Sequence, residues 1–148
     1  MMKTFRVIGL SAIFAALCAV SFAAAKKPVT FIETNEPGWS SIEIREGLSE
    51  DEVWNTIVDI IAKSFQIQLL SKDSGYLRTS WSYSWATGKT SQKYRVRLVV
   101  KINYAKNIVD IRSEANYLIN NVWVEGTDTR LLQTVKRDMS GLISRVTQ

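Results

Sequence analysis

The sequence predicts a two-layer α+β domain, in which an antiparallel sheet carries two helices on one of its faces. Four segments alternate apolar and polar residues with the period of a half-buried strand, and two others repeat apolar residues at the spacing of an amphipathic helix. The connections between these segments are short and no internal repeat divides the chain. One core is therefore expected, over residues 39–148.

Residues 1–25 have the features of a secretory signal peptide. Two basic residues precede residues 7–22, which are almost entirely apolar, and Ala23 and Ala25 supply the small side chains that a cleavage site needs. Cleavage after either alanine fits this pattern. An apolar run of about 16 residues is shorter than the roughly 20 that a membrane span needs, which argues against an uncleaved anchor. The sequence thus predicts a periplasmic or secreted protein after signal cleavage.

Cys18 is the only cysteine, and it lies within the predicted signal peptide. Lipid attachment at such a cysteine requires leucine three residues before it and a small residue directly before it, whereas Ala15 and Leu17 stand in the reverse order. We therefore do not expect lipid anchoring at Cys18. Signal removal would leave no thiol, hence no disulfide and no thiolate metal site. Export without disulfides is typical of a bacterial envelope.

The composition argues against several classes of function. The chain has no histidine, which removes imidazole metal ligands, the commonest general base, and the Ser-His and Cys-His nucleophile pairs. A formal net charge of +5, part of it in the signal peptide, is only mildly basic, whereas nucleic-acid binders cluster Lys and Arg more densely. We expect no nucleic-acid partner, no cofactor and no metal.

The first elements follow from local patterns. Residues 26–38 contain both prolines and are predicted to be a tether or, over residues 29–32, a short edge strand. Residues 39–45 alternate as a strand. Ser49 and Glu52 form a capping box that begins a helix. The inner face of this helix is predicted to consist of Val53, Ile57, Ile60, Ile61 and Ser64, with Trp54 at its flank.

A turn at residues 72–75 separates a short strand, residues 67–70, from a longer one, residues 76–85, that ends in a hairpin loop at residues 86–92. Serine and aromatic side chains alternate along the longer strand. The side chains predicted to face the core are Leu77, Thr79, Trp81, Tyr83 and Trp85. Trp85, nearest the loop, is the one expected to protrude beyond the helices.

The return strand, residues 93–102, and the predicted last strand, residues 108–118, continue the alternation. The residues expected inward are Tyr94, Val96, Leu98, Val100, Ile102, Val109, Ile111, Ser113, Ala115 and Tyr117.

Residues 126–128 are predicted to cap a C-terminal helix. Its apolar stripe comprises Leu131, Leu132, Val135, Met139, Leu142, Ile143 and Val146. A close approach to the sheet would explain Gly141.

The opposite face of the sheet carries the candidate binding surface. It consists of Arg78, Lys93, Arg95, Arg97 and Lys101. Trp85, which the alternation directs to the other face, is a further candidate because it is expected to protrude near the hairpin loop. These cations lie beside a row of serines, Ser80, Ser82 and Ser84, and suit phosphate, lipid head groups or an acidic protein surface. The alternative is a solvated face whose Lys and Arg protect the sheet. On either interpretation, reversing the charges of Arg95 and Arg97 is expected to leave stability nearly unchanged.

Five acidic residues are candidates for catalysis, and none is convincing. Glu50, Asp51 and Glu52 stand at a helix N-terminus, where the dipole favours them without any chemistry. Asp110 and Glu114 would require a raised pKa or a partner. The sequence therefore does not predict an enzyme.

Two runs carry a resemblance to a known family: GLSEDEVW at residues 47–54, followed by the first helix, and SKDSGYLRT at residues 71–79, followed by a long hairpin. They resemble the helix-grip domains of bacterial outer-membrane-assembly lipoproteins of the BamC type, and also small TBP-like envelope domains of unknown function. The similarity covers about residues 40–146 and rests on pattern. It implies a helix-grip fold, an envelope location and a non-catalytic scaffold or binding role. The chain departs from the lipoprotein members at Cys18.

These observations predict an exported, non-catalytic binding or assembly module of the bacterial cell envelope. The alternative is a periplasmic carrier that holds a small apolar ligand or lipid between helix and sheet. The expected partner is an envelope protein or an anionic lipid head group, and peripheral association with a membrane is compatible with both.

Overall fold

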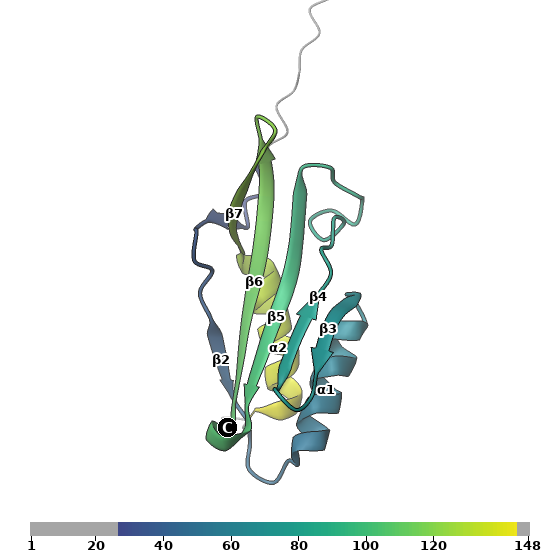
Figure 1. The fold of residues 1–148 in the computed structure, drawn as a ribbon, viewed down its shortest axis with the longest axis vertical. Coiled ribbons are helices and arrows are strands. Elements are labelled where there is room, and N and C mark those ends of the chain that lie inside the picture. The colour runs from purple at the N-terminus through teal and green to yellow at the C-terminus, as the bar shows by residue number, and fades with distance from the viewer. Residues whose placement is uncertain (1–26, 145–148) are drawn as a thin grey trace, which may run out of the picture.

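The computed structural model of the protein describes residues 27–144, so the predicted signal peptide, Cys18 and Val146 lie outside the described residues. This part of the chain forms a seven-stranded antiparallel sheet with two helices on one face, as Figure 1 shows. The predicted two-layer α+β class is confirmed. No helix within residues 27–144 is long and apolar enough to cross a membrane.

The elements occur along the chain as β1 (Phe31–Glu33), β2 (Ser40–Glu43), α1 (Glu50–Ala62), β3 (Ile67–Ser71), β4 (Tyr76–Thr79), β5 (Tyr94–Asn103), the short 3-10 helix η1 (Tyr104–Lys106), β6 (Ile108–Ile119), β7 (Val122–Asp128) and α2 (Thr129–Ile143). In the sheet the strand order is β1-β7-β6-β5-β4-β3, and β2 also pairs with β6.

β6 is the strand on which two halves of the sheet meet. β5 pairs along one of its sides. On the other side, β2 pairs with residues 108–111 and β7 with residues 115–119. Residues 112–114 therefore have no strand partner on that side within the described chain, and the sheet forks there.

The segment predicted as a tether or short edge strand contains β1, which pairs with β7. Phe31 of β1 is buried, with its ring centre 6.0 Å from that of Tyr94 and 6.2 Å from that of Tyr117. In β7, a Cβ at Gly126 would stand 2.3 Å from the carbonyl oxygen of Ile32. Only a glycine allows β1 to approach so closely, so β1 is an integral edge of the sheet.

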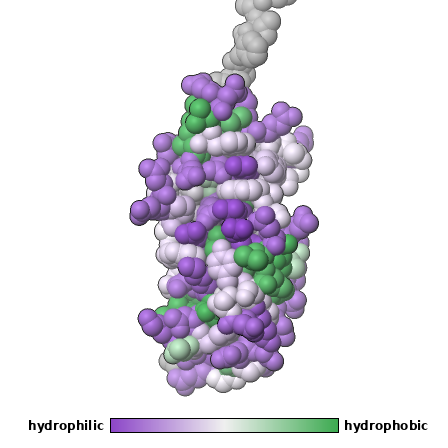
Figure 2. All heavy atoms as spheres, viewed as in Figure 1, coloured by the Kyte–Doolittle hydropathy of each residue, from purple (hydrophilic) through white to green (hydrophobic). Residues whose placement is uncertain are grey.

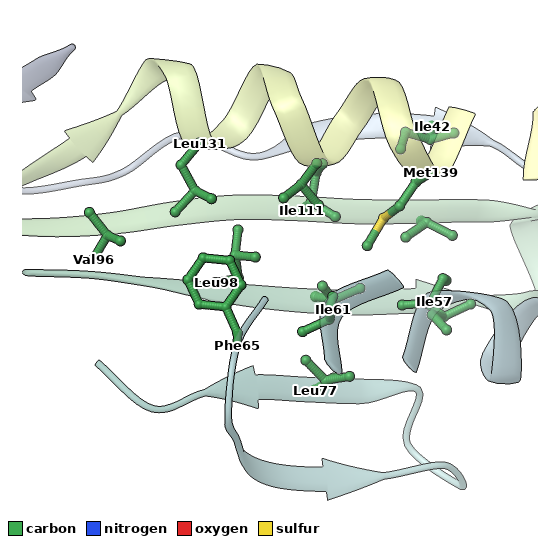
Figure 3. Close-up of a cluster of buried hydrophobic side chains, with 14 of the residues drawn as sticks. Ile42, Ile57, Ile61, Phe65, Leu77, Val96, Leu98, Ile111, Leu131 and Met139 are labelled. Atoms are coloured by element: carbon green, nitrogen blue, oxygen red, sulfur yellow. The ribbon is translucent and has the colours of Figure 1, made fainter. Parts of the chain in front are cut away.

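The inward faces predicted for the two long strands are confirmed, because all ten side chains are buried. They are Tyr94, Val96, Leu98, Val100, Ile102, Val109, Ile111, Ser113, Ala115 and Tyr117. In Figure 3, Ile57 and Ile61 point into this cluster from α1. Leu131 and Met139 point into it from α2. One core thus lies between the sheet and both helices.

α1 begins, as predicted, at a capping box. The Glu52 amide donates to Ser49 Oγ at 3.2 Å, and the Ser49 amide donates to the Glu52 carboxylate at 2.8 Å. Trp54, expected at the flank, is buried. Ser64, predicted on the inner face, is exposed because α1 ends at Ala62.

Asp128 caps α2, as predicted, from a buried position. Its carboxylate accepts hydrogen bonds from the Leu131 amide at 2.8 Å, from the Thr30 hydroxyl at 3.0 Å and from the Tyr94 hydroxyl. Burial, followed by the hydrogen bond to Asp128, raises the pKa of Tyr94 above its ordinary value of 10.0.

Two predictions for the end of α2 are wrong. Leu142, assigned to the apolar stripe, is 53% exposed. The buried residues of α2 are every fourth one from Leu131 to Ile143, so Leu142, which precedes Ile143, lies on the flank of the helix. Gly141 makes no close approach to the sheet, since a Cβ there would meet nothing within 4 Å.

The sequence predicts that the strand over residues 108–118 is the last one. This prediction is wrong, because β7 follows it. Asn120 and Asn121 take φ values of 49° and 63°, as the two central residues of a type I′ hairpin turn do. β7 then pairs with the end of β6. Its Glu125 and Gly126 interrupt the apolar alternation, which hides the strand in the sequence.

The strand predicted over residues 76–85 ends early, at Thr79. The Ser80 amide donates to the Gln66 carbonyl at 2.8 Å, so the pairing with the β3 side continues one residue beyond the pairing with β5. The Leu98 amide of β5 donates instead to the Thr79 hydroxyl at 3.0 Å, which keeps this buried donor satisfied.

After this break the chain returns to β5 out of phase. Ser82 pairs with Val96 one residue out of register with β4, so the alternation of faces reverses. Trp81 and Tyr83, predicted inward, therefore lie on the outer face, where both contact Arg95. Ser82, predicted on the outer face, lies on the side of the helices.

Candidate functional site

The face of the sheet that the helices leave uncovered, named the open face below, carries six basic side chains. They are Arg78, Lys93, Arg95, Arg97, Lys101 and Arg112. The first five are the basic residues of the predicted surface, and the structure brings them together on one face. Figure 2 shows this face as largely hydrophilic.

Val99 lies in the middle of the open face, yet only 1% of it is exposed. Arg78 and Arg112 are its direct cross-strand neighbours on β4 and β6. The Nε atoms of both arginines are buried, which shows that their side chains lie along the sheet. The basic residues of this face thus form a covering layer and do not simply extend into water.

Indole rings and guanidinium groups alternate along part of the open face. The guanidinium carbon of Arg95 lies 4.4 Å from the ring centre of Trp123 and 4.5 Å from that of Trp81. Arg97 lies 4.4 Å from the same ring of Trp81. A cation over an indole gains about 0.5–1 kcal/mol at an exposed site and about 2 kcal/mol when desolvated.

Glu114 connects this row to a second group of cations. Its carboxylate accepts from Nε of Arg97 and from Nη2 of Arg112, both at 2.5 Å. Arg112 in turn lies 4.6 Å from the ring centre of Trp39, and the Lys101 ammonium lies 4.9 Å from it. We name this row the Trp–Arg stack; it consists of Trp123, Arg95, Trp81, Arg97, Glu114, Arg112, Trp39 and Lys101.

Hydrogen bonds fix the orientation of Arg95 further. Its Nε donates to Asn116 Oδ1 at 3.2 Å, and its Nη1 donates to the Tyr83 hydroxyl at 3.4 Å. Asn116 is buried directly opposite it on β6. A planar guanidinium held in this way presents its remaining N–H groups in a set geometry, which suits carboxylate or phosphate oxygens.

A cavity of about 580 Å³ lies beside the Trp–Arg stack, at the fork of the sheet. Residues 35–39 border it on one side. Its wall on the sheet includes Trp81, Arg97, Arg112, Glu114, Asn116 and Glu125. Two arginines thus face three glutamates, counting Glu36, so the charges of the wall nearly cancel. The cavity suits a polar group better than an isolated anion.

Trp85, the sixth residue of the predicted surface, is not on the open face. Its ring centre lies 5.6 Å from that of Phe65, which is buried, and it packs against the core. Arg130 of α2 lies 5.8 Å from its ring centre on the side of the helices. The structure therefore separates Trp85 from the basic residues.

Four of the five acidic residues considered for catalysis have structural partners. Glu52 belongs to the capping box, whose hydrogen bonds to the Ser49 backbone and side chain lower the pKa of Glu52. Asp51 lies 2.6 Å from Lys72, Asp110 accepts a hydrogen bond from β2, and Glu114 joins two arginines. Within residues 27–144, no group of three acidic side chains could hold a metal ion.

The sequence pattern did not assign five residues of the Trp–Arg stack to the candidate surface: Trp39, Arg112, Glu114, Trp123 and Trp81, which it directed inward. Arg112 and Glu114 could have been found, because the alternation of the predicted strand already directs both outward. Trp39 and Trp123 had no such signal, since their positions depend on the segment before β2 and on β7.

A comparison of the sequence with models of known protein families finds no match, and a comparison with curated proteins finds none. Function is therefore inferred from the open face itself.

Proposed function

We propose that this chain is an exported, non-catalytic binding module of the bacterial cell envelope, and that the open face binds an acidic surface of an envelope protein. The observation that carries this proposal is the Trp–Arg stack. Export and the envelope location rest on the signal-like residues 1–25 and on the family resemblance of residues 40–146.

The charge balance of the open face favours an acidic partner. Its six basic side chains stand against four acidic ones, Glu43, Asp110, Glu114 and Glu125. Glu114 is shared by two arginines. Arg78 and Lys93 form no ion pair within residues 27–144. An acidic partner would supply the missing counter-charges and would be steered toward this face.

The rigidity of the Trp–Arg stack favours binding as well. Ordering a long side chain at an interface costs about 0.5–1.5 kcal/mol. Arg95 and Arg97 are already held by indole rings and hydrogen bonds in the free chain, so much of this cost is met before a partner arrives. The core does not require this arrangement, because it lies on the other side of the sheet.

No observation favours the alternative of an apolar carrier. The space between helices and sheet is filled by side chains that are fully or almost fully buried. Four cavities of residues 27–144, among them the one beside the Trp–Arg stack, have no wall residue from α1 or α2.

The test is a crosslinking pull-down from the native envelope. Lys93 and Lys101 are exposed cations of the open face. Because Lys101 lies opposite Asp110 on β6, its charge is removed and not reversed. The double variant Lys93→Glu/Lys101→Gln should lose at least about tenfold in partner capture, or about 1.4 kcal/mol. Added salt should weaken capture by the wild type. The matched control is Lys63→Glu/Lys136→Gln, which makes the same charge change at exposed positions of the helix layer.

Melting temperatures of both double variants should stay close to that of the wild type, because exposed charges contribute little to stability. Reversal of Arg95 and Arg97 is unsuitable for this test, contrary to the expectation from sequence, since a carboxylate at position 97 would face Glu114. Equal capture by the two double variants would exclude the open face. If the wild type bound anionic vesicles and captured no protein, the partner of the open face would be a lipid head group and not an acidic protein.

A further inference from the structure

β3 is an edge of the sheet with an unpaired outer side, because the strand order of the described residues ends there. Its sequence from Ile67 to Ser71, IQLLS, contains no charged residue and no proline. Natural edge strands usually carry such residues, since an unprotected edge offers its free amides and carbonyls to another strand. β3 therefore lacks the ordinary protection against pairing.

Two leucines make this edge apolar on both faces of the sheet. Leu69 is 45% exposed and lies next to Arg78 on the open face, whereas Leu70 is 49% exposed and lies next to Leu77 on the helix side. Figure 2 shows the corresponding hydrophobic patch over β3, on a surface that is otherwise mostly hydrophilic. A strand added to this edge would cover both leucines.

The opposite edge of the sheet shows the contrast. β1 has only three residues, and its Glu33 pairs with Lys27 at 3.8 Å. A short, charged edge strand resists the addition of another strand. Protection is thus present at β1 and absent at β3.

We propose that two copies of this chain associate through β3, with the two β3 strands antiparallel about a twofold axis perpendicular to the sheet. An edge that pairs with its own copy meets the same surface on both sides, so it must not oppose like charges. β3 meets this condition because it carries no charge, and the nearby Lys72 is already paired with Asp51 at 2.6 Å. The basic open face, by contrast, repels a second copy.

The register follows from the regular part of the strand. The pairing of β3 with β4 is irregular between Ile67 and Leu69, and regular from Leu69 to Ser71. An axis at the centre of the regular part places Leu70 opposite Leu70 of the second copy, and Leu69 opposite its Ser71. The two sheets then become continuous, and both open faces lie on the same side. The dimer does not depend on the proposed partner and is measured without it.

Sedimentation equilibrium of the purified chain, from about 10 μM to about 1 mM, tests the association because a small edge interface predicts a weak dimer. The wild type should form dimers in this range. Leu69→Lys, which places a charge on β3, should weaken the dimer by at least about tenfold. Ile32→Lys is the matched control on β1, where the side chain is 53% exposed, and it should dimerise like the wild type. Unchanged melting temperatures would show that both variants are folded.

A cysteine at the proposed axis tests the register. In a chain with Cys18→Ser, oxidation of Leu70→Cys should give an intermolecular disulfide, because opposed residues of antiparallel strands lie within disulfide range. Leu142→Cys, at an exposed site on α2, is the control and should remain largely monomeric. Amide exchange of residues 67–71 should slow as concentration rises. A wild type that stays monomeric throughout, a dimer unaffected by Leu69→Lys, or equal crosslinking at both sites would overturn the proposal.

Discussion

Trp81 is the central ring of the Trp–Arg stack, and its removal tests whether the stack contributes energy. Its ring lies 4.5 Å from the guanidinium of Arg95 and 4.4 Å from that of Arg97. Loss of two such contacts should cost about 1–2 kcal/mol. A partly buried indole also removes roughly 100 Å² of apolar area from water, worth about 2.5 kcal/mol.

Trp81→Ala should therefore lower the free energy of unfolding by roughly 3.5–4.5 kcal/mol, out of a total of about 5–15 kcal/mol for a domain of this kind. The corresponding fall in melting temperature is about 10–20 °C. Thermal and urea unfolding followed by circular dichroism would measure both quantities. Trp81→Phe keeps a ring between the two guanidiniums and should lose only about half as much.

Tyr83→Ala provides the matched control. Tyr83 lies on the same face two residues away, but it is 38% exposed and contacts Arg95 only through a hydrogen bond 3.4 Å long. Its loss should cost less than about 1 kcal/mol. If Trp81→Ala were no more destabilising than Tyr83→Ala, the interpretation of the stack as a preformed, rigid surface would be wrong.

Three further predictions concern the core and the exposed end of α2. Val100→Asp should unfold the chain, because Val100 is fully buried and an unpaired charge there costs about 3–5 kcal/mol. Leu142→Asp, at an exposed site, should change stability by less than about 0.5 kcal/mol, and equal melting temperatures of the two variants would contradict the assignment of faces. Gly141→Ala should raise the free energy of unfolding by about 0.5–1 kcal/mol in urea titrations, since nothing lies within 4 Å of the added methyl group. A loss of stability would contradict the open surroundings of this helix position. Burial and the hydrogen bond to Asp128 raise the pKa of Tyr94, so only the unfolded chain ionises this phenol just above about pH 10, and the free energy of unfolding should fall as pH rises through that value. Tyr94→Phe should flatten this decline, and an unchanged dependence of stability on pH would show that Tyr94 is not its cause.

Local patterns in the sequence determined most of the core. The capping box of Ser49 and Glu52, the stripe of α2 and the alternation of β5 and β6 depend on residues within one or two turns, or within one strand, of each other. Such short-range periodicities are set by helix and strand geometry alone. They also sufficed to direct Arg95 and Arg97 away from the helices.

Tertiary structure alone decided which aromatic side chains join these arginines. The strand through Trp81 has a regular alternation in sequence, but its pairing with β5 breaks after β4 and resumes at Ser82 and Val96, one residue out of register. A one-residue slip moves every following side chain to the other face of the sheet. Trp123 likewise joins the stack only because β7 pairs with β6, and Trp39 joins it only through the segment that leads into β2. These positions depend on hydrogen-bond register between distant segments, which no local period encodes.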